Sequence, residues 1–123
     1  MVLGVGVDIL KIDKLNIDYL SNNDPFVRKV YTPKEQEQAM LREDPLNYFA
    51  TRFAGKEAVY KALNWNGEYI TFLDIEILNH ENGQPYVTLD GKVKEYANKL
   101  GISEVLISLS YDTEYAIAYA IAQ

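Results

Sequence analysis

The stretch RFAGKEAVYKAL, residues 52–63, has the spacing of a helix and sets two charged side chains among apolar ones. On a helix that advances about 100° per residue, Glu57 and Lys61 lie between a row that contains Phe49 and Phe53 and a row of alanines. On a solvated face such a pair contributes only a few tenths of a kcal/mol. Here both neighbouring rows are expected to be buried. Burying a charged side chain costs free energy unless the charge has a partner. A ligand or a metal at this pair is therefore worth proposing.

Asp8 raises the same question near the start of the chain. Residues 2–10 predict a strand with Leu3, Val5, Val7 and Ile9 on one face and Gly4, Gly6 and Asp8 on the other. Capping of a nearby turn is the ordinary interpretation of such an aspartate. Two carboxylates in apolar settings also suit a hard cation such as Mg²⁺, which takes oxygen ligands and is often completed by substrate phosphates. Asp8 and Glu57 are thus candidate Mg²⁺ ligands, and Lys61 is a candidate phosphate-binding cation.

Length and composition predict one folded domain over residues 1–123. The chain is 48% hydrophobic and 12% aromatic and shows no repeat or low-complexity tract, so we expect a single core. It has no cysteine, which rules out disulfides and thiolate metal sites. Residues 1–15 have neither a basic leader nor a long apolar run. We expect a soluble, cytoplasmic protein that does not span a membrane.

The charge of the chain is negative overall but unevenly distributed. A formal net charge of −6 argues against a nucleic-acid or anionic-membrane surface, because phosphate binding of that kind needs clustered Lys and Arg. Residues 11–34 nevertheless hold five basic side chains against three acidic ones, a local net charge of +2. An ordinary solvated face is the simplest interpretation of this segment.

The pattern along the chain predicts a mixture of helices and strands. Helices are expected over residues 12–20, 32–41, 44–63 and 92–100, the second from a Thr32-to-Glu35 capping box and the third from Asp44-Pro45. Further strands are expected over residues 74–78 and 85–89, as a hairpin, and over residues 105–122, as two strands joined near residues 111–114. The last strand is apolar on both faces, which predicts burial on both, with a second subunit as one cover.

Other catalytic arrangements find little support. The only histidine, His80, lies in the predicted hairpin connection, which argues against a Ser-His-Asp hydrolase. Neither a GxGxxG fingerprint nor a P-loop is present.

Four motifs in order resemble a known family. They are GVGVDI at residues 4–9, FAGKEAVYKAL at 53–63, ENGQPYV at 81–87 and ISLS at 107–110. Together they look like the holo-acyl-carrier-protein synthases, small stand-alone 4′-phosphopantetheinyl transferases. The resemblance implies an α+β fold with a long helix packed on an antiparallel sheet, and a homotrimer with active sites between subunits. It also implies transfer of 4′-phosphopantetheine from coenzyme A to a serine of an apo acyl carrier protein, releasing adenosine 3′,5′-bisphosphate.

Site residues carry over by motif position. The resemblance implies that Asp8 and Glu57 bind Mg²⁺ and that Lys61 meets the phosphates or the incoming hydroxyl, whose proton goes to Glu57 or to a metal-bound water. It further implies contacts with coenzyme A at six other positions: Arg52, Lys56, Asn64, Gly67, Pro85 and Tyr111. Because the family's carrier proteins are acidic, the basic segment gains a purpose as their docking surface, through Lys11, Lys14, Arg28 and Lys29.

The chain departs from the family pattern in four places. Asn64-Trp65-Asn66-Gly67 replaces a glycine-rich turn, Tyr111 replaces a histidine, Lys14 replaces a more frequent arginine, and Lys11 stands where an acidic residue is common. A glycine allows close backbone approach to a phosphate, and tyrosine lacks the charge of an imidazolium. Two other hypotheses therefore stay open: a non-catalytic relative that binds coenzyme A or a carrier protein, and an oligomeric structural domain whose acidic residues are merely solvated.

Overall fold

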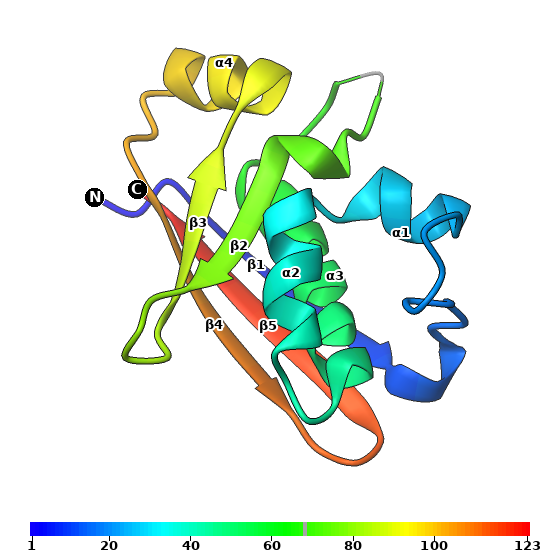
Figure 1. Ribbon diagram of the computed structural model, residues 1–123. Coiled ribbons are helices and arrows are strands. Elements are labelled where there is room, and N and C mark those ends of the chain that lie inside the picture. The colour runs from blue at the N-terminus through cyan, green and yellow to red at the C-terminus, as the bar shows by residue number, and fades with distance from the viewer. Residues whose placement is uncertain (68) are drawn as a thin grey trace.

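A computed structural model describes residues 1–67 and 69–123, and its centre is one long helix packed on a three-stranded sheet (Figure 1). The sheet has the order β1-β5-β4, with β1 at Gly4–Lys11, β5 at Tyr115–Ala122 and β4 at Val105–Tyr111. Both strand pairs are antiparallel. Helix α3, Pro45–Ala62, crosses one face of this sheet. The α+β fold expected from the sequence is confirmed.

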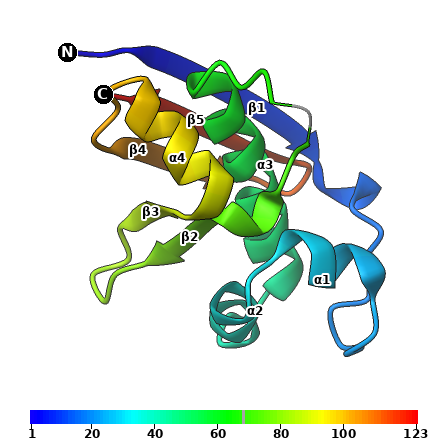
Figure 2. The ribbon, with the colours of Figure 1, turned by 90° about the horizontal axis from the view of Figure 1, so that it is seen from above.

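The remaining elements cover the other side of α3. Figure 2 shows α3 between the sheet on one side and α1 and α2 on the other. The elements are α1 at Pro25–Val30, α2 at Pro33–Met40, a hairpin of β2 at Ile75–Asn79 and β3 at Pro85–Leu89, and α4 at Gly91–Lys99. Two short 3₁₀ turns, η1 at Ile12–Lys14 and η2 at Phe72–Asp74, complete the described chain. Helix α3 is thereby covered on most sides.

Local sequence explains where α3 begins and ends. The Asp44 carboxylate accepts a hydrogen bond from the Asn47 amide, and Pro45 occupies the first turn, where its missing N–H is not needed. The helix ends before Asn64, whose φ of 51° is left-handed, a conformation that asparagine tolerates better than most residues. The predicted helix over residues 44–63 is confirmed to within one residue at each end.

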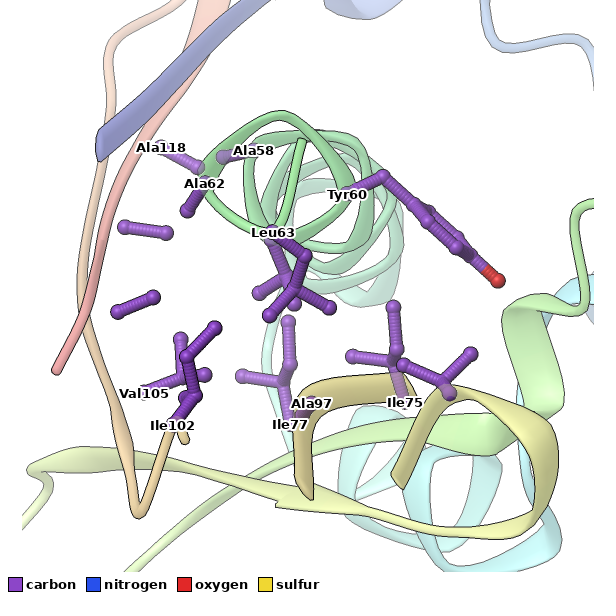
Figure 3. Close-up of a cluster of buried hydrophobic side chains, with 14 of the residues drawn as sticks. Ala58, Tyr60, Ala62, Leu63, Ile75, Ile77, Ala97, Ile102, Val105 and Ala118 are labelled. Atoms are coloured by element: carbon purple, nitrogen blue, oxygen red, sulfur yellow. The ribbon is translucent and has the colours of Figure 1, made fainter. Parts of the chain in front are cut away.

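Small residues bring α3 unusually close to the sheet. A Cβ on Gly6 would lie 2.1 Å from the Ala58 carbonyl oxygen, and one on Gly4 would lie 1.9 Å from that of Ala62. The helix therefore rests directly on the backbone of β1. In Figure 3, Ala58 and Ala62 point toward Ala118 of β5, and Leu63 points into the apolar cluster on the other side.

The expected helix over residues 12–20 is wrong. Only η1, at Ile12–Lys14, has helical hydrogen bonding. Beyond it Leu15, Ile17 and Tyr19 turn inward, a two-residue alternation that an extended chain satisfies and a helix does not. The next helix, α1, was missed, although Asp24 accepts a hydrogen bond from the Val27 amide just as an N-cap should.

Burial of β5 on both faces does not occur within one chain. Its alanines are fully buried against α3, whereas Tyr115, Ile117 and Tyr119 on the other face are 41–44% exposed. The neighbouring strand β1 presents Val5, Val7 and Ile9 on the same outer face, each about half exposed or more. Within one chain, the sheet has one covered face and one exposed apolar face.

No helix among the described residues is long and apolar enough to cross a membrane.

Candidate active site

The middle of β1 and the second half of α3 bring Asp8, Glu57 and Lys61 together. The Lys61 ammonium donates to the Asp8 carboxylate at 3.1 Å and to the Val7 carbonyl at 2.9 Å. Because Gly4 and Gly6 let the helix approach β1, the next residue on that face of the strand, Asp8, lies beside the helix. The predicted grouping of these residues is thus present in the structure.

Glu57 lies one turn before Lys61 and is half-buried. Burial raises the pKa of its carboxyl, and the negative charge of Asp8 raises it further, against the opposing effect of Lys61. Two carboxylates with one shared ammonium leave an excess of negative charge, which attracts a cation. Lys61 itself is more exposed than expected, with 54% of its side chain accessible.

Asp8 and Glu57 fit a divalent cation that takes only a few of its ligands from the protein. Among residues 1–67 and 69–123, no group of three or more acidic or histidine side chains is gathered that could hold a metal. A cation held by Asp8 and Glu57 would therefore complete its shell with water and substrate oxygens, as Mg²⁺ commonly does. The oxygen-only donors are those that Mg²⁺ prefers.

A cavity of about 340 Å³ opens beside this group. Its lining consists of Glu57, Tyr60, Lys61, Asn64, Trp65 and Ile70. Trp65 packs edge-on between Tyr60 and Tyr96, with ring centroids 5.4 and 4.7 Å away, and the Tyr96 hydroxyl donates to the Asn64 carbonyl at 2.8 Å. The aromatic rings fix the turn after α3 at the mouth of the cavity.

Three other predicted residues gather elsewhere. Arg52, Pro85 and Tyr111 line a second cavity of about 390 Å³, together with Arg42 and Asn79. The Arg52 guanidinium lies 3.7 Å from the centre of the Tyr48 ring, and it donates to the Ile77 carbonyl and to Asn79 Oδ1. The cavity is therefore lined by two guanidinium groups: that of Arg52, which these contacts fix, and that of Arg42, which is exposed.

The model of the 4′-phosphopantetheinyl transferase superfamily matches residues 4–120. The chain belongs to this superfamily. A holo-[acyl-carrier-protein] synthase of Clostridium novyi is 41% identical to this transferase-superfamily chain over 123 residues, covering 100% of the chain and 88% of the relative. The resemblance drawn from the four motifs is confirmed.

Solved structures agree with the fold of the superfamily member. A holo-[acyl-carrier-protein] synthase of Neisseria meningitidis matches with a TM-score of 0.84 at 26% identity, covering 100% of this chain and 99% of that one. The enzyme of Helicobacter pylori, in complex with coenzyme A, matches with a TM-score of 0.78 at 30% identity, covering 97% and 99%.

Lys56, a residue of α3 for which a contact with coenzyme A was also implied, is placed differently in this transferase-superfamily chain. It is fully buried, and its ammonium donates to the Val30 carbonyl, the Glu35 carboxylate and the Phe72 carbonyl at 2.6, 2.7 and 3.0 Å. All three donors are taken, so this geometry favours a structural role over the implied contact with a nucleotide. On the helical wheel Lys56 lies on the side away from the alanine row, where α1 and α2 cover α3.

Sequence reasoning missed Arg42 and Asn79. Arg42 Nη2 donates to Asn79 Oδ1 at 3.1 Å, and Asn79 Nδ2 donates to the Gly83 carbonyl at 2.7 Å. The only signal was indirect, since Asn79 ends β2 and lies opposite Pro85 in the same hairpin. A contact between residues so far apart in the chain depends on the tertiary fold.

Proposed function

We propose that this superfamily member is a holo-acyl-carrier-protein synthase, which transfers 4′-phosphopantetheine from coenzyme A to a serine of an apo acyl carrier protein. The observation that carries the proposal is the meeting of Asp8, Glu57 and Lys61 beside an open cavity. The holo-[acyl-carrier-protein] synthases that are similar to it over most of their length support the same reaction.

The reaction is a displacement at the β-phosphorus of coenzyme A. A bond forms between the serine oxygen and that phosphorus, the bond to the bridging oxygen breaks, and adenosine 3′,5′-bisphosphate leaves with that oxygen. Lys61, which the Val7 carbonyl already orients, is placed to offset charge on the phosphates. The serine proton passes to the ionised Glu57 carboxylate, directly or through a water.

Mg²⁺ is part of the proposal. Asp8 and Glu57 would hold it, and when bound it supplies Lewis acidity and a template for the pyrophosphate oxygens. The excess negative charge at these two carboxylates supports this assignment.

The proposed site lies between subunits of a homotrimer. Arg52 and Lys61 are nine residues apart on α3, an axial distance of about 14 Å, and they line separate cavities. An exposed apolar sheet face supports self-association, since patches of this kind mark interfaces. We infer that one subunit supplies Asp8, Glu57 and Lys61, and its neighbour supplies the cavity of Arg52, Pro85 and Tyr111.

An acidic carrier protein is the proposed partner. Lys11, Lys14, Arg28 and Lys29 are all exposed, around the end of β1, η1 and the last turn of α1. A basic surface of this kind speeds and orients the approach of an acidic protein.

The test uses the purified protein, coenzyme A, Mg²⁺ and a panel of apo carrier proteins. Mass spectrometry is expected to detect the phosphopantetheine adduct on at least one carrier, and Glu57→Ala is expected to reduce the rate about 100-fold or more. If no carrier is modified while a known synthase modifies them, the proposal is wrong.

The Trp65 and Tyr111 departures favour one alternative, a relative that binds coenzyme A without turnover. It predicts a calorimetric signal for coenzyme A and no adduct on any carrier.

A further inference from the structure

Lys56 and Glu35 form an ion pair at the centre of the molecule. Their charged atoms are 2.7 Å apart, and both side chains are fully buried. An ion pair in such surroundings is weak evidence for stability, because desolvation offsets much of its attraction. We therefore expect the contribution of this ion pair to lie in the elements that it holds together.

Each partner of the pair is bonded to backbone from several elements. Lys56 also donates to the Val30 carbonyl, at the end of α1, and to the Phe72 carbonyl in η2. Glu35, in the first turn of α2, accepts from the amides of Thr32 and Ile77 at 2.9 Å each. The pair thus joins α1, α2, η2 and β2 to the middle of α3.

The Val30 carbonyl ends the helix that presents Arg28 and Lys29. Carbonyls at a helix C-terminus lack partners within the helix, and a lysine ammonium satisfies them well. The next residue, Tyr31, is also bound to α3, because its hydroxyl donates to the Phe49 carbonyl at 2.8 Å. Two contacts with α3 therefore set where the basic end of α1 lies.

We propose that Lys56 is a positioning residue that fixes the basic end of α1 relative to Glu57, its neighbour on α3. The inference rests on the proposed function, in which Arg28 and Lys29 receive the carrier protein and Glu57 serves the transfer. Lys56 then sets the distance between the docked carrier and the reacting phosphate without touching either one.

A positioning role predicts that loss of Lys56 weakens the use of the carrier protein but not the binding of coenzyme A. In a Lys56→Met variant, the Michaelis constant for the carrier is expected to rise about tenfold, while the dissociation constant for coenzyme A changes less than about twofold. Coenzyme A binding is measured by the fluorescence of Trp65, the only tryptophan, which lines the cavity beside Lys61. A comparable weakening of both substrates overturns the inference and favours the nucleotide contact.

A double variant separates positioning from stability. Lys56→Met alone leaves the Glu35 carboxylate buried without a counter-charge and is expected to lower the melting temperature. Lys56→Met with Glu35→Met removes both charges but also the acceptor of the Thr32 and Ile77 amides. We therefore expect the melting temperature to recover in part, while the carrier Michaelis constant stays raised. If the Michaelis constant recovers together with the melting temperature, Lys56 has only a structural role and the inference is wrong.

Hydrogen exchange tests the same idea without activity. Amides of α1 are expected to exchange at least about tenfold faster in the double variant than in the wild type, while those of β5 are unchanged. Equal protection of α1 in both proteins overturns the inference. If the wild type modifies no carrier at all, the proposed function fails, but this exchange measurement still decides whether Lys56 holds α1.

Discussion

At the residue scale, the charge on Glu57 depends on its surroundings. A half-buried carboxyl beside Asp8 binds a proton more readily than a free glutamate, and Lys61 only partly offsets this. A bound divalent cation would reverse the balance, because it favours the ionised form. A proton and a metal ion therefore compete for the Glu57 carboxylate.

This balance predicts opposite effects of pH with and without ligand. Because the pKa of Glu57 is raised on folding, its protonation stabilises the folded state, so its contribution to the free energy of unfolding rises as pH falls toward and through the raised pKa. The increase in melting temperature caused by Mg²⁺ and coenzyme A needs the ionised form of Glu57, so it shrinks as pH falls over the same range.

Differential scanning fluorimetry of the wild type and Glu57→Gln measures both effects. The variant has no carboxyl at this position, so the difference in melting temperature between the wild type and the variant isolates the contribution of Glu57. Parallel pH curves for the two proteins would contradict the prediction.

Gly6 predicts a steric effect at the same scale. A Cβ there would approach the Ala58 carbonyl oxygen to 2.1 Å, so Gly6→Ala must push α3 away from β1. We expect a loss of about 2 to 3 kcal/mol in the free energy of unfolding, measured by urea denaturation. Thr88→Ala, at an exposed position of β3, is the matched control and should cost much less. Equal stability of the two variants would count against close packing of helix and strand.

At the element scale, most helices begin where short-range signals place them. The capping box of α2 is complete: the Thr32 hydroxyl accepts from the Glu35 amide at 3.2 Å, and the Glu35 carboxylate accepts from the Thr32 amide at 2.9 Å. The same hydroxyl donates to Glu76 of β2 at 2.6 Å. One threonine thus starts a helix and ties it to a strand.

Thr32→Ala removes both contacts of the hydroxyl. We expect a loss of about 1 to 2 kcal/mol in the free energy of unfolding, whereas Thr32→Ser, which keeps the hydroxyl, should lose much less. Chemical denaturation of the two variants provides the measurement. A serine variant as unstable as the alanine variant would show that the methyl group, not the hydrogen bonds, matters.

At the scale of the whole molecule, the proposed trimer predicts a site shared by neighbouring subunits. Glu57 lines one cavity, and Arg42, an exposed side chain, lines the other. In a closed ring of three subunits, each site would combine the first cavity of one subunit with the second cavity of the next.

Mixing of two inactive variants tests this arrangement. Glu57→Gln and Arg42→Glu are each expected to reduce carrier modification strongly. In a random 1:1 mixture, each trimer that contains both variants has one intact site of three, so about one quarter of all sites should regain activity. Light scattering checks the trimer mass, and variants mixed without exchange of subunits serve as the control. No recovery in verified mixed trimers would place each site within one chain.

Local signals predicted much of the fold and the first half of the site. Helix α3 carries Asp44-Pro45 at one end and the Asn64 turn at the other, and its charged pair stood out against apolar neighbours. Asp8 was recognisable because a strand with glycines on one face leaves room on that face. These features depend on neighbouring residues, so the sequence by itself determined them.

Tertiary structure alone decided the roles of Lys56, Arg42 and Asn79. Lys56 and Arg52 are both basic residues beside the same motif, yet one is locked to Glu35 in the core and the other borders a cavity. The sequence shows a charge but not which distant acceptors surround it. The acceptors of Lys56 come from α1, α2 and η2, and those of Arg52 come from β2. Only the packing of these elements around α3 brings them within hydrogen-bonding distance.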